Sequence, residues 1–411
     1  MWDEEIEKAM LYYLIYEQEE YLLDESDFTT ERNKKIIKAI NELKAEKQEI
    51  TILSIKSKIR ANQKQVLDYI TSLGEYVRTT TAENVYNELI NLSKKRKIFR
   101  IMQEQTTEIA NCENIDILAQ QIIKQINEVE KINEKEKTFL EQVIDTTEKI
   151  EKATQQGMDY SLYTGITDID NKICGLHKQE LTIIGARPGV GKTTFALQIA
   201  ENIANKGIET AIVSLEMSDY QIIQKMLARK TRINSYKMRM GTLESEDLSR
   251  IGLAGAEIST LPIHLITKAR TLQYIENTTR KLKNKSNLGL LIIDYIQLIQ
   301  NKGKFNSREQ EVADITRTLK LLSLELDIPI VGLCQLNRNA TRQEPMLSDL
   351  RESGAIEQDA DNVLFLYQEK EEESNIVDIT LKIAKQRAGE IGKVSLKFNK
   401  AMSEFKGVMR C

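Results

Sequence analysis

The chain has 411 residues, of which 41% are hydrophobic and 29% charged, and its formal net charge at pH 7 is −4. This length supports about two or three domains, and the acidic balance excludes nucleic-acid binding that is driven by the field of the whole molecule. No apolar run approaches the roughly 20 residues that span a bilayer, the acidic start is unlike a signal peptide, and the four cysteines form no CxxC pair, so we expect a cytoplasmic protein without membrane contact.

The first third of the chain is predicted to be helical. All four prolines and every glycine except Gly74 lie at or beyond Gly157, and a stretch this poor in chain breakers favours helices. We expect an all-α domain over residues 1–110. One predicted core stripe follows the capping candidates Thr29 and Thr30 and consists of Ile36, Ile37, Ile40 and Leu43. A second, on a longer helix, consists of Val85, Leu89, Leu92, Ile98 and Phe99.

Residues 111–156 read as a linker that contains one short helix. The charge run from Glu130 to Lys137 is typical of a solvated segment. The apolar stripe that follows it consists of Phe139, Leu140, Val143, Ile144 and Ile150. A helix isolated between two domains has to bury such a stripe, either on its own chain or on a neighbouring subunit, and the sequence leaves both open.

Strands and helices alternate over residues 157–411. Several strand candidates are near-continuous apolar runs, which is typical of a parallel sheet covered on both faces, and the alternation predicts an α/β domain. The candidates are Leu181–Ile184, Thr210–Leu215, Ile263–Ile266, Leu290–Ile293, Ile328–Leu333, Val363–Tyr367, Ile376–Ile383 and Val394–Phe398.

The run IGARPGVGKTTF, residues 184–195, lies between a predicted strand and a predicted helix, the context of a phosphate-binding loop. Gly189 and Gly191 allow backbone N–H groups to turn towards phosphate oxygens. Lys192 can reach the β- and γ-phosphates, and the Thr193 hydroxyl can bind Mg²⁺. The usual first glycine of the motif is replaced by an alanine. The predicted nucleotide-binding residues are Ala186, Arg187, Pro188, Gly189, Val190, Gly191, Lys192, Thr193 and Thr194.

Three further polar residues end apolar runs. Asp294 follows Leu290–Ile293 in the Walker B arrangement, which delivers a carboxylate to the edge of the sheet where it can hold Mg²⁺. Glu216 follows the strand after the phosphate-loop helix and can orient the attacking water. Gln335 closes another apolar run, and its amide can sense the γ-phosphate. Together with the phosphate loop, these residues predict nucleotide hydrolysis.

Lys385 and Arg387 end a later strand. On the residues alone, they could serve the nucleotide of the same subunit, DNA, or a nucleotide that is held by the next subunit. Arginine supplied across an interface strongly stabilises transition-state charge in enzymes of this type.

Several long blocks occur in an order that resembles the replicative DNA helicases of the DnaB family. They are GARPGVGKTTFA, SLEMS, LLIIDYIQL, SREQEVADITRTLK, PIVGLCQLNR, PMLSDLRESGAIEQDAD and IAKQRAGEIG. The resemblance covers nearly all of residues 157–399, whereas the N-terminal part matches more loosely. It implies a RecA-like ATPase domain behind an all-α collar and a helical linker.

The resemblance also implies roles for individual residues. Glu216 becomes the catalytic carboxylate, Asp294 the Walker B acid and Gln335 the γ-phosphate sensor. Arg387, assisted by Lys385, becomes the arginine finger that reaches the ATP of the adjacent subunit. The segment that grips single-stranded DNA in the central channel corresponds to Arg351, Glu352 and Gly354, and a second loop near the channel to Lys302–Arg308.

For the whole protein, the resemblance implies a homo-hexameric ring that uses ATP and Mg²⁺. Such a ring moves 5′→3′ along one strand, unwinds a forked duplex, and works with a primase and a helicase loader. Two other functions remain open at this point. One is a strand-exchange recombinase of the same fold, which would need neither collar nor linker helix. The other is an ATP-regulated loader that binds protein and never moves along DNA.

Overall fold

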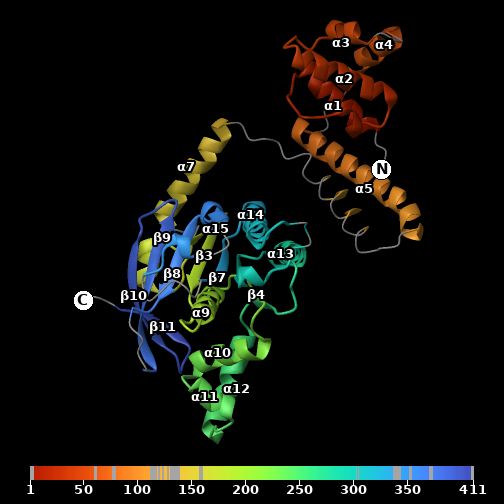
Figure 1. The fold of residues 1–411 in the computed structure, drawn as a ribbon. Coiled ribbons are helices and arrows are strands. Elements are labelled where there is room, and N and C mark those ends of the chain that lie inside the picture. Colours follow the sequence, from red (N-terminus) through yellow and green to blue (C-terminus); the bar gives the residue numbers. More distant parts are fainter. Residues whose placement is uncertain are drawn as a thin grey trace. The chain divides into compact units, whose positions relative to one another are not determined.

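The structure is a computed structural model whose elements form two compact units, Met1–Thr147 and Glu148–Cys411 (Figure 1). It describes residues 4–59, 63–75, 80–111, 139–156, 161–301, 303, 305–336, 344–350, 354–369 and 374–408, together with short pieces between 118 and 129. Each unit has a hydrophobic core of its own. None of the described helices is long and apolar enough to cross a membrane.

The N-terminal unit is helical, as predicted. Its described α-helices are α1 (Glu4–Tyr16), α2 (Glu31–Ala45), α3 (Ile52–Lys58), α4 (Gln63–Leu73) and α5 (Ala82–Asn111). At the start of α2, the Thr30 hydroxyl accepts a hydrogen bond from the Asn33 backbone N–H, which satisfies a donor that a helix end leaves free. The whole stripe from Ile36 to Leu43 that was predicted on this helix is buried in the core.

A buried carboxylate joins three helices of this unit. Glu7 of α1 is 1% exposed and accepts hydrogen bonds from the Thr29 backbone N–H and from Asn33 Nδ2, each at 2.7 Å. Tyr69 Oη of α4 donates to Asn33 Oδ1 at 2.9 Å. Because a buried charge is costly unless it is hydrogen-bonded, this network constrains how α1, α2 and α4 pack.

Among the described side chains of α5, those that belong to the apolar core lie in its first part. Val85 and Leu89 are buried, but Leu92 and Ile98 are only half-buried and Phe99 is 49% exposed. The prediction of one core stripe is therefore wrong for its last three members. The apolar cluster of this unit ends at Ile90, whereas the helix continues to Asn111.

Helix α7 (Phe139–Gln156), where a linker helix was predicted, carries an exposed apolar stripe. Phe139 is 81% exposed, and the other members of the stripe, Leu140, Val143, Ile144 and Ile150, are exposed as well. The charge run that precedes the helix lies outside the described residues.

A nine-stranded sheet forms the centre of the second unit in the described residues, with the order β11-β10-β9-β8-β3-β7-β6-β4-β5. The strands from β8 to β5 pair in parallel, and β9, β10 and β11 continue the sheet with antiparallel pairs. Their bounds are β3 (Leu181–Ala186), β4 (Thr210–Ser214), β5 (Ile263–Ile266), β6 (Leu290–Asp294), β7 (Ile330–Gln335), β8 (Asn362–Tyr367), β9 (Ile376–Gln386), β10 (Gly392–Asn399) and β11 (Glu404–Gly407). A separate pair consists of β1 (Ser161–Leu162) and β2 (Leu176–His177).

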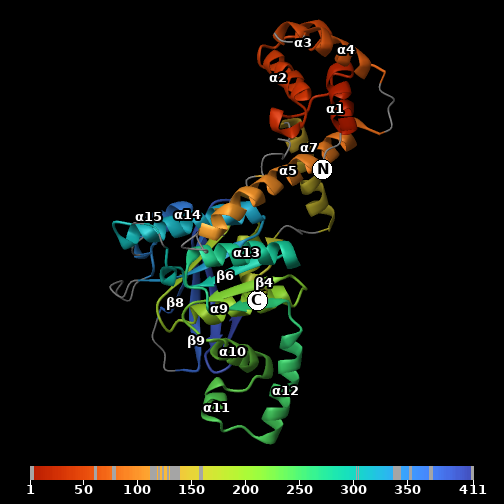
Figure 2. The ribbon, with the colours of Figure 1, turned by 90° about the vertical axis from the view of Figure 1, so that its right-hand side faces the viewer.

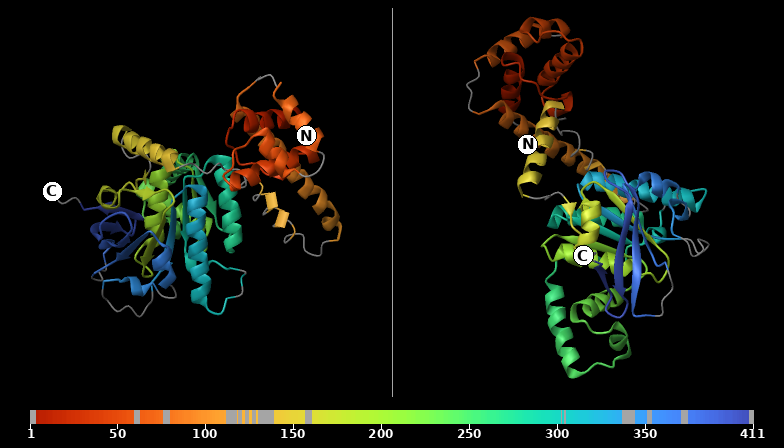
Figure 3. Two further views of the ribbon diagram at one scale, coloured as in Figure 1. Left: turned by 90° about the horizontal axis from the view of Figure 1, so that it is seen from above. Right: turned by 90° about the vertical axis from the view of Figure 1, so that its left-hand side faces the viewer.

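Helices cover both faces of this sheet, as the apolar strands predict. α9 and α10 lie on one side, and α13 and α14 on the other (Figure 2). α10, α11 and α12 extend from the sheet as a helical projection (Figure 3). The bounds are α8 (Thr167–Ile173), α9 (Lys192–Ala204), α10 (Asp219–Thr231), α11 (Ser235–Met240), α12 (Ser245–Ser259), α13 (Leu272–Ser286), α14 (Arg308–Leu326) and α15 (Gly354–Asp359).

All strands that were predicted in this unit are present, with small shifts at their ends. Three strands were missed. β1 and β2 have two residues each, and β11, with the sequence EFKG, has one large apolar residue. Segments this short and polar carry no period-2 pattern that identifies a strand.

Candidate functional site

The loop between β3 and α9 has two glycines in the left-handed backbone region, Gly189 with φ +85° and Gly191 with φ +101°. Gly191 is the N-cap of α9, so the N–H groups of the first helical turn are available to an anion. A Cβ at Gly191 would lie 2.8 Å from Phe398 Cε1, whereas a Cβ at Gly189 would meet nothing within 4 Å. The loop therefore has the backbone conformation of a phosphate-binding loop, and Gly191 packs against the rings of Phe398 and Phe405.

Lys192, the first residue of α9, is a buried cation at this loop. Its Nζ lies 3.7 Å from Asp294 Oδ1 and 4.4 Å from the centre of the Tyr295 ring. Burial lowers the pKa of Lys192, and the charge of Asp294 opposes this shift. A phosphate group beside the ammonium would stabilise the charged form of Lys192, which burial disfavours.

Asp294, at the end of β6, is the acidic partner of the loop. It is 2% exposed, its Oδ2 accepts a hydrogen bond from Thr193 Oγ1 at 2.6 Å, and its Oδ1 has no hydrogen-bond partner. A buried carboxylate oxygen that accepts no hydrogen bond, although the Lys192 ammonium lies 3.7 Å from it, fits Mg²⁺ together with the neighbouring hydroxyl. Mg²⁺ is bound through a few protein oxygens together with phosphate and water. The described residues hold no metal-binding group of three or more His, Cys, Asp or Glu side chains, so phosphate oxygens would have to complete the coordination.

Glu216 and Gln335 lie at the same edge of the sheet. Glu216 is exposed just beyond β4, where the Leu215 backbone N–H donates to the Asp294 carbonyl at 2.7 Å. Gln335 ends β7 in register with Ala186. The structure thus brings the phosphate loop, Asp294, Glu216 and Gln335 together at the carboxyl ends of the parallel strands, where open α/β sheets bind ligands.

Two residues at this edge were not found from the sequence. Gln297, in the short helix η2 (Ile296–Leu298), brackets the backbone of Gln335, because its Nε2 donates to the carbonyl at 3.2 Å and its Oε1 accepts from the N–H at 3.3 Å. Lys225 of α10 donates to Thr194 Oγ1 at 3.3 Å, and burial lowers its pKa against the opposing charge of Asp294. Lys225 was missed because it belongs to none of the quoted motifs. Gln297 lies within the block LLIIDYIQL, three residues after Asp294, but the block alone assigned it no role.

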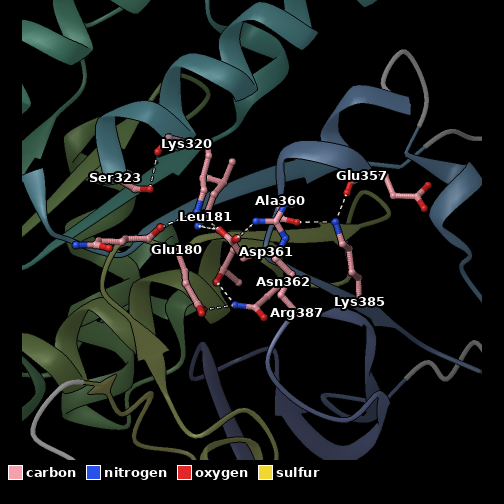
Figure 4. Close-up of polar contacts among 12 residues, drawn as sticks. Glu180, Leu181, Lys320, Ser323, Glu357, Ala360, Asp361, Asn362, Lys385 and Arg387 are labelled. Carbon is pink, nitrogen blue, oxygen red and sulfur yellow. Dashed lines mark hydrogen bonds and ion pairs between the residues drawn. The ribbon is translucent and has the colours of Figure 1, made fainter. Parts of the chain in front are cut away.

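Lys385 and Arg387 lie beside the amino ends of the parallel strands β3 and β8, whereas the phosphate loop follows the carboxyl end of β3 (Figure 4). β9 runs antiparallel to β8, and the Arg387 backbone N–H donates to the Asp361 carbonyl, next to the start of β3. The six residues of β3 advance about 3.3 Å each, so its two ends lie roughly 16 Å apart, far beyond the length of an arginine side chain. The structure does not bring these two residues to the phosphate loop of their own chain.

The predicted DNA segment is largely outside the described residues. Arg351 and Glu352 are not described, and Gly354 begins α15. In the second loop, Lys302 and Lys304 are likewise outside the described part. Arg308, which closes that loop, donates from Nη2 to the carbonyls of Gln297 and Ile299 and so fastens the start of α14 to η2.

Family models match both units of the chain. Residues 161–407 match the model described as the DnaB-like helicase C terminal domain, and residues 2–92 match the DnaB-like helicase N terminal domain.

Individual relatives cover most of the chain. Replicative DNA helicase DnaB of Geobacillus stearothermophilus is 34% identical over 412 residues, which cover 95% of this chain and 90% of that protein. Replicative DNA helicase DnaC of Bacillus subtilis (strain 168) is 36% identical over 372 residues, covering 84% and 79%. A solved structure of a DnaB-like replicative helicase and its interactions with primase has a TM-score of 0.68 at 30% identity and covers 99% of this chain and 100% of that one. A second solved structure, described as an ATPase domain, has a TM-score of 0.61 at 34% identity, covering 67% and 100%.

Proposed function

Because this chain belongs to the family of DnaB-like replicative DNA helicases, we propose that it assembles as a hexameric ring that uses ATP and Mg²⁺ to move 5′→3′ along single-stranded DNA. The family hydrolyses ATP to unwind DNA, so this chain is a replicative helicase and an ATPase. Membership of this family argues against a strand-exchange recombinase and against an ATP-regulated loader, because the helicase models match both the C-terminal part and residues 2–92. As a replicative enzyme, it would work in the cytoplasm on forked duplexes.

The phosphate loop binds the triphosphate in this proposal. The backbone N–H groups of the loop between Ala186 and Thr194, apart from Pro188, which has none, donate to the phosphates, and Lys192 neutralises their charge. Thr193 and Asp294 would hold Mg²⁺, which would supply positive charge to the phosphate oxygens. The support is the buried Asp294 carboxylate, whose Oδ1 accepts no hydrogen bond and which lies beside the Thr193 hydroxyl and the Lys192 ammonium.

Hydrolysis requires groups that orient water and detect the γ-phosphate. Glu216 lies exposed at the loop edge and accepts a proton from the attacking water. Gln335 contacts the γ-phosphate through its amide, and Gln297 keeps its backbone in place. Burial and then the charges of Glu216 and Asp294 raise the pKa of Tyr295, which supports the closeness of Glu216 to this site.

Arg387, assisted by Lys385, completes the site of the neighbouring subunit. The observation that carries this proposal is the position of Lys385 and Arg387 beside the amino ends of the parallel strands, whereas their own phosphate loop lies at the carboxyl ends. An arginine that cannot reach its own nucleotide, and whose side chain is 57% exposed, suits a nucleotide held by the next chain. The exposed stripe of α7 suits the same assembly, because burial against a neighbouring subunit would cover it.

Single-stranded DNA binds in the ring channel through Arg351, Glu352 and Gly354. Contacts from a few loops to the phosphate backbone bind single strands with little sequence preference. Six copies around one channel provide enough donors even though each chain is acidic. One of the similar solved structures is that of a DnaB-like replicative helicase and its interactions with primase. We propose that this chain also works with a primase and with a helicase loader.

The test is unwinding of a forked duplex with ATP and Mg²⁺. We expect a fork with a 5′ tail to be unwound and a matched fork with only a 3′ tail to remain paired. Unwinding of the 3′-tailed fork alone would contradict the direction. An ATPase activity that single-stranded DNA does not change would contradict ATP-driven movement along DNA.

A further inference from the structure

Asp361 is a buried carboxylate at the sheet edge that carries Arg387 (Figure 4). It is 3% exposed, and three donors meet it. Oδ2 accepts from the Leu181 backbone N–H at 2.8 Å and from Lys320 Nζ at 2.7 Å, while Oδ1 accepts from Arg387 Nη1 at 3.1 Å. No part of the proposed ATPase cycle uses this residue.

The backbone of Asp361 is held as firmly as its side chain. Its N–H donates to the Leu181 carbonyl at 2.9 Å, and its carbonyl accepts from the Arg387 N–H at 3.0 Å. Just before it, the Ala360 carbonyl accepts from Lys385 Nζ at 2.8 Å. A carboxylate fixed at both main-chain and side-chain level can set the direction of the flexible group that it binds.

The charges of the cluster favour this role. Lys320 of α14 shares the carboxylate and also donates to the Gln179 carbonyl at 2.7 Å. Two cations therefore meet the one carboxylate of Asp361. Asp361 contacts one corner of the Arg387 guanidinium, whose side chain stays more than half exposed. The remaining N–H donors can still meet an anion from outside.

We infer that Asp361 is a positioning residue for catalysis in trans: it orients Arg387 of its own chain towards the triphosphate of the neighbouring subunit. The inference rests on the proposed role of Arg387. An arginine held in the productive direction before the nucleotide arrives loses less conformational freedom in the transition state.

The test uses Asp361→Asn, which keeps the shape of the side chain and removes its charge. We expect turnover to fall between about ten- and a hundredfold, less than the roughly thousandfold loss for Arg387→Ala. Nucleotide affinity should stay unchanged, because the phosphate loop is at the other edge. Asp378→Asn is the control for removing a carboxylate that pairs with a cation, since Asp378 of β9 forms an exposed pair with Lys397. An equal loss in the control would overturn the inference.

Mixed rings separate positioning from a structural role. Lys192→Ala chains cannot bind ATP but carry an intact Arg387 and Asp361. Co-assembled with Asp361→Asn chains, they should raise turnover above the sum of the two variants alone, as they should with Arg387→Ala chains. Recovery with Arg387→Ala but not with Asp361→Asn would overturn the inference and leave the proposed function standing. Recovery with neither would overturn the trans arginine itself, and the inference with it.

The two changes should also be non-additive. If Asp361 acts through Arg387, Asp361→Asn should lower turnover no further in a chain that already carries Arg387→Ala. A further tenfold loss in the double variant would show a role that is independent of the arginine and would contradict the inference.

Discussion

Replacing Gly191 with alanine should destabilise the ATPase unit more than the same change at Gly189. Both glycines have positive φ, which costs an L-residue about 1–2 kcal/mol. Only at Gly191 does the new Cβ meet atoms, with Phe398 Cε1 at 2.8 Å and Phe405 Cζ at 3.0 Å. These two rings stack with centroids 4.2 Å apart, so they cannot move aside without losing contact.

The steric term adds about 1–3 kcal/mol, the usual cost of overpacking a core. We therefore expect a loss of about 2–5 kcal/mol for Gly191→Ala and about 1–2 kcal/mol for Gly189→Ala. Urea denaturation without nucleotide, followed by circular dichroism, measures both. The only tryptophan, Trp2, precedes the described residues and is far from Gly191 in the sequence, so circular dichroism is the probe.

A second substitution tests the cause. Phe398→Leu removes the ring that the new methyl group would meet, so Gly191→Ala should cost less in its presence by about 1 kcal/mol or more. Equal losses for the two glycine variants, or fully additive losses in the double variant, would refute the packing argument.

Four further outcomes are expected. Lys192→Ala should abolish nucleotide binding in an equilibrium titration and with it turnover; near-normal turnover would overturn the phosphate-loop assignment. Burial lowers the pKa of Lys192 from its ordinary 10.5 and bound phosphate raises it again. ATP binding should therefore weaken as the pH rises through the pKa that Lys192 has in the free protein, and around and above that pH it should take up protons. Calorimetry in buffers of different ionisation enthalpy tests this, and proton release would contradict it. Glu7→Ala should cost the N-terminal unit about 2–4 kcal/mol in chemical denaturation, against about 0.5 kcal/mol or less for the exposed Glu5→Ala; equal losses would contradict the network. Arg351→Ala should weaken oligonucleotide binding by fluorescence anisotropy and leave DNA-independent turnover intact, whereas an unchanged affinity would refute the channel contact.

The closeness of the phosphate loop and Asp294 could be predicted from the sequence because its signals are local. The phosphate loop is one continuous strand–loop–helix run, and Asp294 directly follows the apolar strand that delivers it. Both depend on neighbours in the chain, which a pattern records. The same locality explains why the N-cap Thr30 and the stripe of α2 were predicted correctly.

The Asp361 cluster could not be predicted in this way. Its partners Leu181, Lys320 and Arg387 are 180, 41 and 26 positions away in the chain, and only the sheet order brings them together. Phe99 was predicted to be a core residue but is exposed. Helical spacing identifies the apolar face of a helix, but it does not show where along the helix the packing against other elements ends. Patterns thus record periodicity, whereas burial and ion pairing depend on segments that are distant in the sequence.

The central claim is that each chain binds a triphosphate in its own loop and depends on a neighbour to hydrolyse it. Mass photometry and ATP turnover, measured on the same samples across a dilution series, test this most directly. We predict that turnover per chain falls in step with the loss of rings and that isolated chains bind ATP but hardly hydrolyse it. Isolated chains that hydrolyse ATP at the undiminished rate would contradict the account.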